Sequence, residues 1–320
     1  MKLLFVADPL ESFKIYKDTT FAMMREAQKR GHSISSCEPT DILWQRGAPV
    51  TASVRHITLT GQSPGWFTEA PQAADALPLA LKDFDAIVMR KDPPFDSEFF
   101  YATHLLEQAE REGARVFNKP RALRDHPEKL AILEWPQFIG PTLVTRDAQA
   151  IRRFHAEHQD IILKPLDGMG GMGIFRVKED GLNLGAIIET LNKDGAETVM
   201  VQAFLPAIAQ GDKRVLVIGG QPVPFSLARI PQGGEVRGNL AAGGKGVAQP
   251  LTERDREIAQ AIGPVLAARG LLLIGLDVIG DHLTEINVTS PTCFQEISDQ
   301  TGFDVAAMFV DALEAACAAC

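Results

Sequence analysis

Three side chains near the C-terminal end carry oxygen ligands at a spacing that brings them together: Asp277, Glu285 and Asn287. Two apolar runs, 271–279 and 283–288, flank the turn-like residues Gly-Asp-His, and this pattern predicts a β-hairpin. With a three-residue loop, Ile279 would pair with Leu283 and Asp277 would lie opposite Glu285. Because side chains alternate along a strand, Asn287 points the same way as Glu285. The other face is apolar and can be buried: Ile274, Leu276, Val278, Ile286 and Val288.

The chemistry of such a face is cation binding. Two carboxylates at a separation of roughly 4 Å repel each other by about 4 kcal/mol at an effective dielectric of about 20. Sharing a proton or binding a cation relieves that repulsion. Two carboxylates and one amide suit Mg²⁺ or Mn²⁺ better than zinc, which prefers nitrogen and sulfur. We therefore predict a metal site; the alternative is a solvated hairpin face with an incidental acidic pair.

A glycine-rich segment, Asp167-Gly-Met-Gly-Gly-Met-Gly173, lies between two expected strands, 160–164 and 174–178. Its spacing satisfies G-x-G-x-x-G, but a dinucleotide-binding turn requires a helix next, and here a strand follows. We interpret it as a hairpin loop whose backbone N–H groups approach phosphate oxygens, the alternative being a flexible hairpin tip. The lysines that could reach such phosphates are Lys164, which ends the preceding strand, and Lys129.

A second glycine-rich segment, 229–246, carries Arg229 and Arg237. Ordering so many glycines is costly, which favours a lid that closes over an anionic substrate; the alternative is a disordered surface loop. Residues 202–205 end an expected strand, 198–205, and are a candidate hinge that offers backbone groups to a nucleotide base.

The elements that must position these groups alternate between strand and helix in the N-terminal part. Buried strands are expected at 2–7, 85–90 and 114–118, with helices at 19–30 and 97–112, which indicates a parallel sheet. Arg90 then lies at the carboxyl end of a strand, where such sheets bind ligands. Residues 48–80 read as irregular. A helix is expected to start at Asp125, and the pattern beyond it is α+β.

The composition excludes several classes of function. The 320-residue chain has a formal net charge of −9, which argues against non-specific nucleic-acid binding. No apolar stretch approaches the length of a membrane span, so we expect a cytoplasmic protein without a membrane partner. Cys317 and Cys320 form a terminal C-x-x-C without a neighbouring Cys or His cluster, and we predict no redox or metal role for them.

Longer blocks of sequence carry a resemblance to a known family. Met89-Arg-Lys-Asp-Pro-Pro-Phe-Asp96, Ile162-Leu-Lys-Pro-Leu-Asp-Gly-Met-Gly-Gly171, Ala228-Arg-Ile-Pro-Gln-Gly-Gly234, Arg237-Gly-Asn-Leu-Ala-Ala-Gly-Gly244 and Thr284-Glu-Ile-Asn-Val-Thr-Ser-Pro-Thr292 resemble bacterial glutathione synthetases of the ATP-grasp superfamily. The resemblance implies an α/β fold in three parts. These are an N-terminal parallel-sheet, substrate-binding domain (1–123), an ATP-grasp small lobe with the glycine-rich loop (124–206), and a large lobe with the lid and the metal site (207–320).

The resemblance also implies a reaction: ATP, γ-glutamylcysteine and glycine give glutathione, ADP and phosphate through an acyl phosphate, with Mg²⁺ or Mn²⁺. A homo-oligomer, dimer or tetramer, is implied as well. Two alternatives stay open, another ATP-grasp carboxylate–amine ligase and a nucleotide-binding protein without catalysis. A dehydrogenase built on the glycine motif is disfavoured by the strand that follows it.

Residue roles follow from the resemblance by matching position. The ATP-binding residues would be Lys129, Lys164, Gly168, Gly170, Gly171, Gln202, Phe204 and Leu205. Catalysis would use Arg214, Arg229 and Arg237, and substrate binding would use Arg90, Asn239 and Ser290. The metal ligands would be Asp277, Glu285 and Asn287.

Overall fold

The computed structural model describes residues 1–71, 77–234, 237–238, 240 and 243–319. The N-terminal part is a six-stranded sheet in the order β6-β5-β2-β1-β8-β9. Four neighbouring strands are parallel, as predicted: β1 (Lys2–Val6), β2 (Ser33–Cys37), β8 (Ala86–Met89) and β9 (Val116–Phe117). The helices that connect them are α1 (Thr19–Lys29) and α2 (Ser97–Arg111), and both begin with an aspartate cap.

The prediction that residues 48–80 are irregular was wrong. This segment contains β5 (Arg55–Leu59) and β6 (Phe67–Glu69), which extend the main sheet antiparallel to β2. It also contributes two strands to a small antiparallel sheet of β3 (Ile42–Leu43), β4 (Thr51–Ala52) and β7 (Leu79–Ala80). Strands this short carry too few residues for an alternating pattern to stand out among the surrounding proline, glycine and serine residues.

The helix predicted to start at Asp125 was also wrong, because α3 (Pro120–Asp125) ends there. Pro127 disfavours a helical conformation at the residue before it, and His126 has φ −126° and ψ 68°. The chain continues instead through two short 3-10 turns, η4 (Ala131–Glu134) and η5 (Pro136–Phe138). The other 3-10 turns of the described residues are η1 (Leu10–Ser12), η2 (Pro39–Asp41), η3 (Leu81–Asp83) and η6 (Pro206–Gln210).

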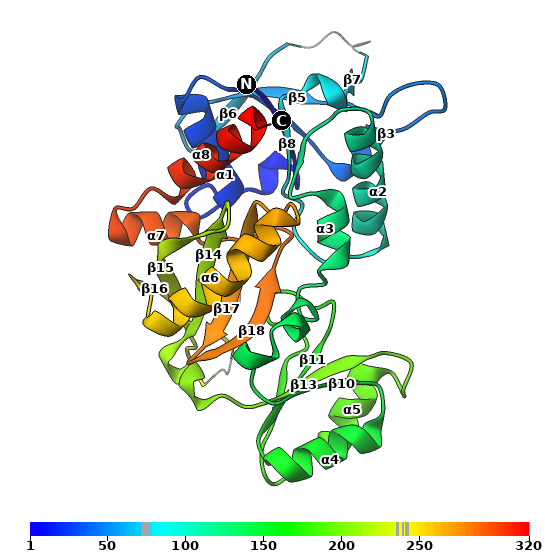
Figure 1. Cartoon of the computed structure of the whole chain (residues 1–320), viewed down its shortest axis with the longest axis vertical. Coiled ribbons are helices and arrows are strands. Elements are labelled where there is room, and N and C mark those ends of the chain that lie inside the picture. The colour runs from blue at the N-terminus through cyan, green and yellow to red at the C-terminus, as the bar shows by residue number, and fades with distance from the viewer. Residues whose placement is uncertain (72–76, 235–236, 239, 241–242, 320) are drawn as a thin grey trace.

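A small antiparallel sheet in the order β10-β13-β11-β12 forms a separate lobe. Its strands are β10 (Thr142–Thr145), β11 (Ile161–Pro165), β12 (Phe175–Val177) and β13 (Val199–Ala203). Two helices, α4 (Ala148–His158) and α5 (Leu184–Asn192), cover the face that points away from the rest of the molecule (Figure 1). This lobe has its own apolar core, which includes Ile151, Leu163, Val177, Ile188 and Val201.

The third sheet forms the centre of the molecule, in the order β16-β15-β14-β17-β18 and antiparallel throughout (Figure 1). Its strands are β14 (Asp212–Ile218), β15 (Gln221–Ile230), β16 (Lys245–Pro250), β17 (Leu273–Ile279) and β18 (His282–Asn287). Helix α6 (Glu253–Ala268) packs on this sheet and begins at the capping box of Thr252 and Asp255.

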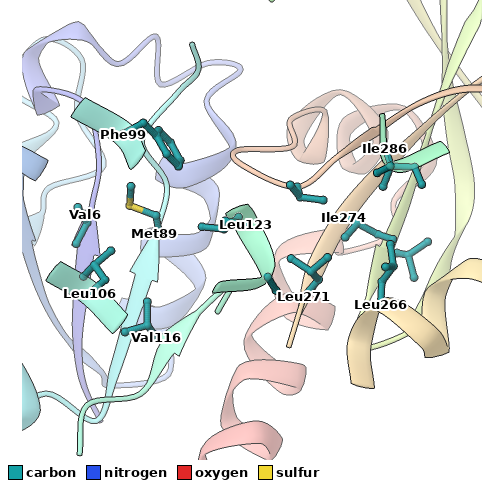
Figure 2. Close-up of a cluster of buried hydrophobic side chains, with 14 of the residues drawn as sticks. Val6, Met89, Phe99, Leu106, Val116, Leu123, Leu266, Leu271, Ile274 and Ile286 are labelled. Atoms are coloured by element: carbon teal, nitrogen blue, oxygen red, sulfur yellow. The ribbon is translucent and has the colours of Figure 1, made fainter. Parts of the chain in front are cut away.

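One buried apolar cluster joins the N-terminal sheet to the central sheet. Val6 and Met89 belong to the same cluster as Ile274 and Ile286, with Leu123 of α3 between the two groups (Figure 2). The carboxyl end of β8 is therefore fixed relative to the β17–β18 hairpin, whereas the small lobe has a core of its own.

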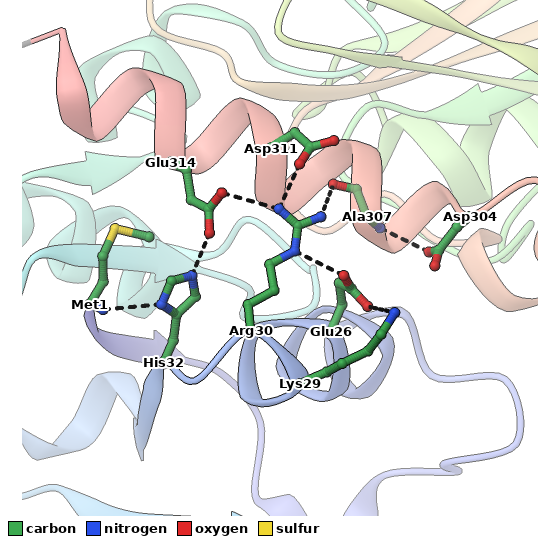
Figure 3. A network of polar contacts seen from close by, with 9 residues as sticks. All are labelled: Met1, Glu26, Lys29, Arg30, His32, Asp304, Ala307, Asp311 and Glu314. Atoms are coloured by element: carbon green, nitrogen blue, oxygen red, sulfur yellow. Dashed lines mark hydrogen bonds and ion pairs between the residues drawn. The ribbon is translucent and has the colours of Figure 1, made fainter.

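The last two helices, α7 (Phe294–Thr301) and α8 (Val305–Ala318), pack between the central sheet and α1: α7 contacts β15, β16 and α1, and α8 contacts α1 and β14. Arg30 holds α8 from the end of α1: its guanidinium donates to the Asp311 carboxylate at 2.6 Å and to Glu314 at 3.1 Å, and it pairs with Glu26 of α1 at 2.8 Å (Figure 3). Among the described residues, no helix is both long enough and apolar enough to cross a membrane.

Candidate active site

The β17–β18 hairpin places Asp277 opposite Glu285, as predicted, although its turn and its strand pairing differ from the prediction. The turn is only two residues long, so Ile279 pairs with His282 and not with Leu283. A bulge at Thr284 then adds one residue to β18 and restores the predicted register. The hydroxyl of Thr284 donates to the Asp277 carbonyl at 3.1 Å and fixes the bulge. The apolar face is buried as predicted: Ile274, Leu276, Val278, Ile286 and Val288.

Cations, rather than a shared proton, relieve the repulsion at Asp277. Its carboxylate accepts from Arg214 Nε at 2.6 Å and pairs with Arg229 Nη2 at 2.9 Å. Burial alone would raise the pKa of Asp277, but the two guanidinium groups hold it well below its usual value. Asp277 is therefore an anion enclosed by two cations.

Glu285 and Asn287 have different partners from Asp277. Glu285 Oε1 lies 3.1 Å from the ammonium group of Lys129. The Asn287 amide nitrogen donates to the Gly275 carbonyl at 3.2 Å across the hairpin, so the orientation of its side chain is set by β17.

The glycine-rich loop joins β11 to β12, an antiparallel pair, so the prediction of a hairpin was correct and that of a dinucleotide turn is excluded. Gly170 and Gly171 have φ values of +60° and +83°, which other residues rarely adopt. A Cβ atom on Gly168 would lie 2.8 Å from the Pro165 side chain. The Lys129 ammonium donates to the Gly168 carbonyl at 2.6 Å, and Arg237 donates to the Gly171 carbonyl at 3.4 Å.

Lys164 ends the strand that leads into this loop and is buried. Its ammonium donates to the Thr284 carbonyl at 3.3 Å. Burial lowers the pKa of Lys164, an effect that Glu285 opposes and Lys129 reinforces. The strand leading out of the small lobe, β13, carries the candidate hinge. There the Gln202 amide donates to Thr142 at 3.0 Å.

The hinge continues into Phe204, whose ring lies 3.5 Å below the Arg176 guanidinium carbon, and Leu205, which precedes η6. The Phe204 backbone N–H donates to the Asp160 carbonyl at 2.8 Å, so this group is already used within the lobe.

The carboxyl end of β8 supplies the remaining groups. Arg90 is buried, and it donates to the Thr20 hydroxyl and to the Pro291 carbonyl, both at 3.0 Å. Burial lowers the pKa of Arg90 to about 10. The Ser290 hydroxyl donates to Asp92 at 2.6 Å. The strand end and the segment after β18 are thus joined by direct contacts.

A single cavity of about 490 Å³ is lined by every predicted site residue that the structure describes. They come from all three parts of the chain: Arg90, Lys129, Lys164, Gly168, Gly170, Gly171, Gln202, Phe204, Leu205, Arg214, Arg229, Arg237, Asp277, Glu285, Asn287 and Ser290. Asn239 and Cys320 lie outside the described residues. Cys317 lies on α8, and its Sγ atom donates to the Asp85 carbonyl at 3.7 Å.

Asp212 also lines this cavity, although it was not among the predicted site residues. Its carboxylate pairs with Arg229 at 2.5 Å, and Oδ1 is buried without a hydrogen-bond partner among the described residues. Burial raises the pKa of Asp212 to about 6, with Arg229 opposing and Asp277 reinforcing the rise. A signal was available, because Asp212 and Arg214 are two residues apart on one strand and therefore share a face.

Glu128 was missed as well. Its Oε1 accepts from the N–H groups of Val288 and Thr289 at 2.8 and 3.0 Å, and from the Thr289 hydroxyl at 2.8 Å. Burial and the neighbouring Glu285 raise its pKa. This carboxylate ties the segment before η4 to the end of β18. An acidic residue beside a lysine resembles a solvated surface pair, so the sequence offers no comparable signal.

The donor set fits a hard divalent cation. Asp277 and Glu285 are cross-strand neighbours, Asn287 lies on the same hairpin, and all three line the cavity. Within the described residues no cluster of three or more His, Cys, Asp or Glu side chains could hold a metal. Two carboxylates and an amide, with water and phosphate oxygens completing the shell, are what Mg²⁺ uses in phosphate-binding sites.

Two family models match this chain. Residues 1–124 match the family model described as prokaryotic glutathione synthetase, N-terminal domain, and residues 128–302 match prokaryotic glutathione synthetase, ATP-grasp domain. The chain is 61% identical to a protein named glutathione synthetase from Ralstonia nicotianae, over 99% of this chain and 96% of that protein. It is 57% identical to one of the same name from Nitrosomonas europaea, over 98% of both.

A similar fold occurs among solved structures. The crystal structure of D-cycloserine synthetase DcsG has a TM-score of 0.67 to this chain at 15% identity, covering 98% of this chain and 99% of that one. At that identity the likeness concerns the fold alone. The two family matches together span most of the sequence and agree with the close relatives, so this chain belongs to the prokaryotic glutathione synthetase family.

Proposed function

We propose that this chain is an ATP-dependent carboxylate–amine ligase that joins γ-glutamylcysteine and glycine to give glutathione, ADP and phosphate. The observation that carries the proposal is the cavity in which a glycine-rich loop, two buried lysines, four arginines and a carboxylate hairpin converge, in a chain of this family. These groups suit phosphoryl transfer, which needs charge neutralisation and positioning more than a protein nucleophile.

ATP is proposed to lie between the small lobe and the central sheet. Lys129, Lys164 and the backbone of the glycine-rich loop would bind its phosphates. The hinge side chains of Gln202, Phe204 and Leu205 would surround the adenine. Support comes from their shared cavity and from the direct contact of Lys129 with the loop at Gly168.

The metal is proposed to be Mg²⁺ or Mn²⁺, held by Asp277, Glu285 and Asn287. When bound, such an ion neutralises the developing charge on the phosphate oxygens. Before that, Arg214 and Arg229 keep the Asp277 carboxylate ionised, in the protonation state that a hard cation requires.

The acceptor is proposed to be the cysteinyl carboxylate of γ-glutamylcysteine, which attacks the γ-phosphorus of ATP and releases ADP. Arg90 and Ser290, with Asn239 of the lid, would bind the substrate. Arg214, Arg229 and Arg237 would stabilise the charge on the transferring group. Glycine's amine then attacks the acyl phosphate at carbon, and phosphate leaves as the amide forms. Exclusion of water by the lid protects the acyl phosphate from hydrolysis.

Each of the three predicted parts of the chain is proposed to have its own role. Residues 1–123 would bind substrate, 124–206 would cover ATP, and 207–320 would carry the metal site and the lid. A homo-oligomer is also proposed, on the ground of the family to which the chain belongs. A cytoplasmic location stays a prediction, supported by the use of ATP.

One assay tests the proposal directly. Phosphate release from ATP is measured with γ-glutamylcysteine, with and without glycine, and the product is identified by mass. We expect rapid release only when both substrates are present, in one-to-one ratio with glutathione. Faster turnover of another acid and amine pair would assign the chain to a different ligation, and nucleotide binding without release would exclude catalysis.

A further inference from the structure

The two buried lysines of the cavity have different partners. Lys129 lies 3.1 Å from the Glu285 carboxylate and also donates to the Gly168 carbonyl. Lys164 donates to a backbone carbonyl, that of Thr284, and no ion pair within 4.0 Å involves it among the described residues. Both are assigned to ATP phosphates in the proposed function, but only Lys129 contacts a proposed metal ligand.

The hairpin carboxylates are neutralised by cations assigned to phosphate. Asp277 is held by Arg214 and Arg229, and Glu285 is held by Lys129. Asp212, which shares Arg229, completes a group of three carboxylates and three cations whose formal charges cancel. A divalent cation that arrives alone therefore meets no net negative charge at this hairpin.

We infer that Lys129 neutralises Glu285 in the free protein and transfers to the nucleotide phosphates when they bind, which makes Glu285 available as a metal ligand only together with nucleotide. The inference rests on the proposed metal site and adds the order of binding: the metal ion binds together with the nucleotide or after it. Leaving a partly buried carboxylate without its cation is costly. Lys129 therefore leaves Glu285 only when the metal ion takes its place beside that carboxylate, and we call this replacement the exchange. Lys129 acts here as a positioning residue.

A thermodynamic consequence can be measured without turnover. Metal and nucleotide must bind with positive cooperativity, and the coupling is the same from either side. Part of that coupling comes from direct contact between metal and phosphate, and that part does not depend on Lys129. The part that comes from the exchange disappears when Lys129 is replaced by a neutral residue.

The experiment measures Mn²⁺ binding to the whole protein by electron paramagnetic resonance of the free ion, with and without ADP. Wild type is expected to bind Mn²⁺ weakly alone and at least about 10-fold more tightly with saturating ADP. In Lys129→Gln, Mn²⁺ affinity without ADP is expected to rise about 10-fold, and the gain from ADP to shrink. Lys164→Gln is the matched control: it removes an equally buried positive charge that makes no ion pair with Glu285, so it should weaken ADP binding and raise Mn²⁺ affinity without ADP clearly less than Lys129→Gln does.

The outcomes separate this inference from the proposed function. If wild type binds no Mn²⁺ even with ADP, the metal site itself is wrong. If wild type binds Mn²⁺ with ADP but Lys129→Gln gains no affinity without ADP, or if Lys164→Gln gains as much, the exchange is overturned and the metal site stands. Lys129→Met fills the same space with an unbranched neutral side chain and gives a second reading if the glutamine variant does not fold. Lys129→Arg keeps the charge and should show no gain.

Discussion

The β17–β18 hairpin and the glycine-rich loop face the same cavity but contribute to it in opposite ways. The hairpin presents charged side chains, each fixed by a partner at 2.6–3.1 Å, above a buried apolar face. The loop presents backbone, and its shape requires glycine at positions with positive φ such as Gly170 and Gly171. The function of the hairpin therefore depends on the identity of its side chains. The function of the loop depends on having no side chain at its glycine positions.

This contrast separates the effects of substitution. A change of charge at the hairpin should abolish chemistry while the apolar face keeps the fold. A single methyl group in the loop should change backbone conformation and therefore nucleotide affinity, with a smaller effect on the chemical step.

The largest effect is expected for Glu285→Gln. Turnover should fall about 1,000-fold, equivalent to about 4 kcal/mol of activation free energy, because a metal ligand loses its charge. The melting temperature should change by only a few degrees, since the amide oxygen can still accept from Lys129. Steady-state kinetics and thermal unfolding measure the two quantities. Glu257→Gln makes the same change at an exposed residue of α6 and should have no effect on either; ordinary turnover of the Glu285 variant would remove the metal assignment.

Arg237→Ala tests the contact between the lid and the loop. Arg237 donates to the Gly171 carbonyl, and the proposed function places its charge near the transferring phosphoryl group. We expect kcat to fall about 100-fold, as for the loss of one donor to a developing charge, and ADP affinity to change much less. Kinetics and ADP titration give the two values, with exposed Arg121→Ala as the control. Equal losses of kcat and ADP affinity would instead indicate that Arg237 only supports the loop.

Gly171→Ala addresses the loop itself. An alanine at φ +83° costs roughly 1–2 kcal/mol, which corresponds to about a 10-fold rise in the KM for ATP if the loop relaxes in the free protein and must be restored on binding. The value of kcat should change little. Gly31→Ala is a matched control, because Gly31 has φ +80° with open space around an added Cβ and lies after α1. It should lose comparable stability at unchanged KM; a similar KM rise in both variants would show that the loop backbone has no special role.

The hairpin was largely predictable because its two strands are neighbours in the sequence, so a short segment contains the whole pattern. Alternation along two strands identified the buried face, and the pairing of Asp277 with Glu285 was predicted correctly. The turn was nevertheless read one residue too long, and the bulge at Thr284 compensated for it. A bulge leaves no clear mark in a sequence, because it depends on the partner strand.

The rest of the site could not be read in this way, because its contacts join distant segments. Glu128 is 160 residues from Val288, whose N–H it accepts, and neither sequence neighbourhood reveals the other. The resemblance supplied Arg90 and Ser290 as substrate-binding residues, but not their links through Thr20, Pro291 and Asp92. Short strands in residues 48–80 were missed because their pairing, not their composition, defines them.

The smallest effect is expected for Glu296→Gln. This substitution compares an unpaired carboxylate of the cavity with the paired carboxylates of the hairpin. Glu296 of α7 lines the same cavity, but its Oε2 is buried without a hydrogen-bond partner among the described residues, unlike the paired Asp277 and Glu285. Burial raises its pKa above the ordinary 4.5, so the folded state holds this proton more tightly than the unfolded state does. The free energy of unfolding of wild type, relative to the variant, must therefore fall as pH rises above about 4.5.

At pH 7.5 Glu296→Gln should be more stable than wild type by about 1 kcal/mol, because the neutral amide avoids the cost of keeping an ionised carboxylate partly buried. As the pH falls below 4.5, the difference should shrink because the wild-type carboxyl becomes protonated in the folded and the unfolded state alike. Urea unfolding on both sides of this pH measures it. A difference that is independent of pH would mean that Glu296 is satisfied in solution, and the contrast between paired and unpaired carboxylates in this cavity would then be lost.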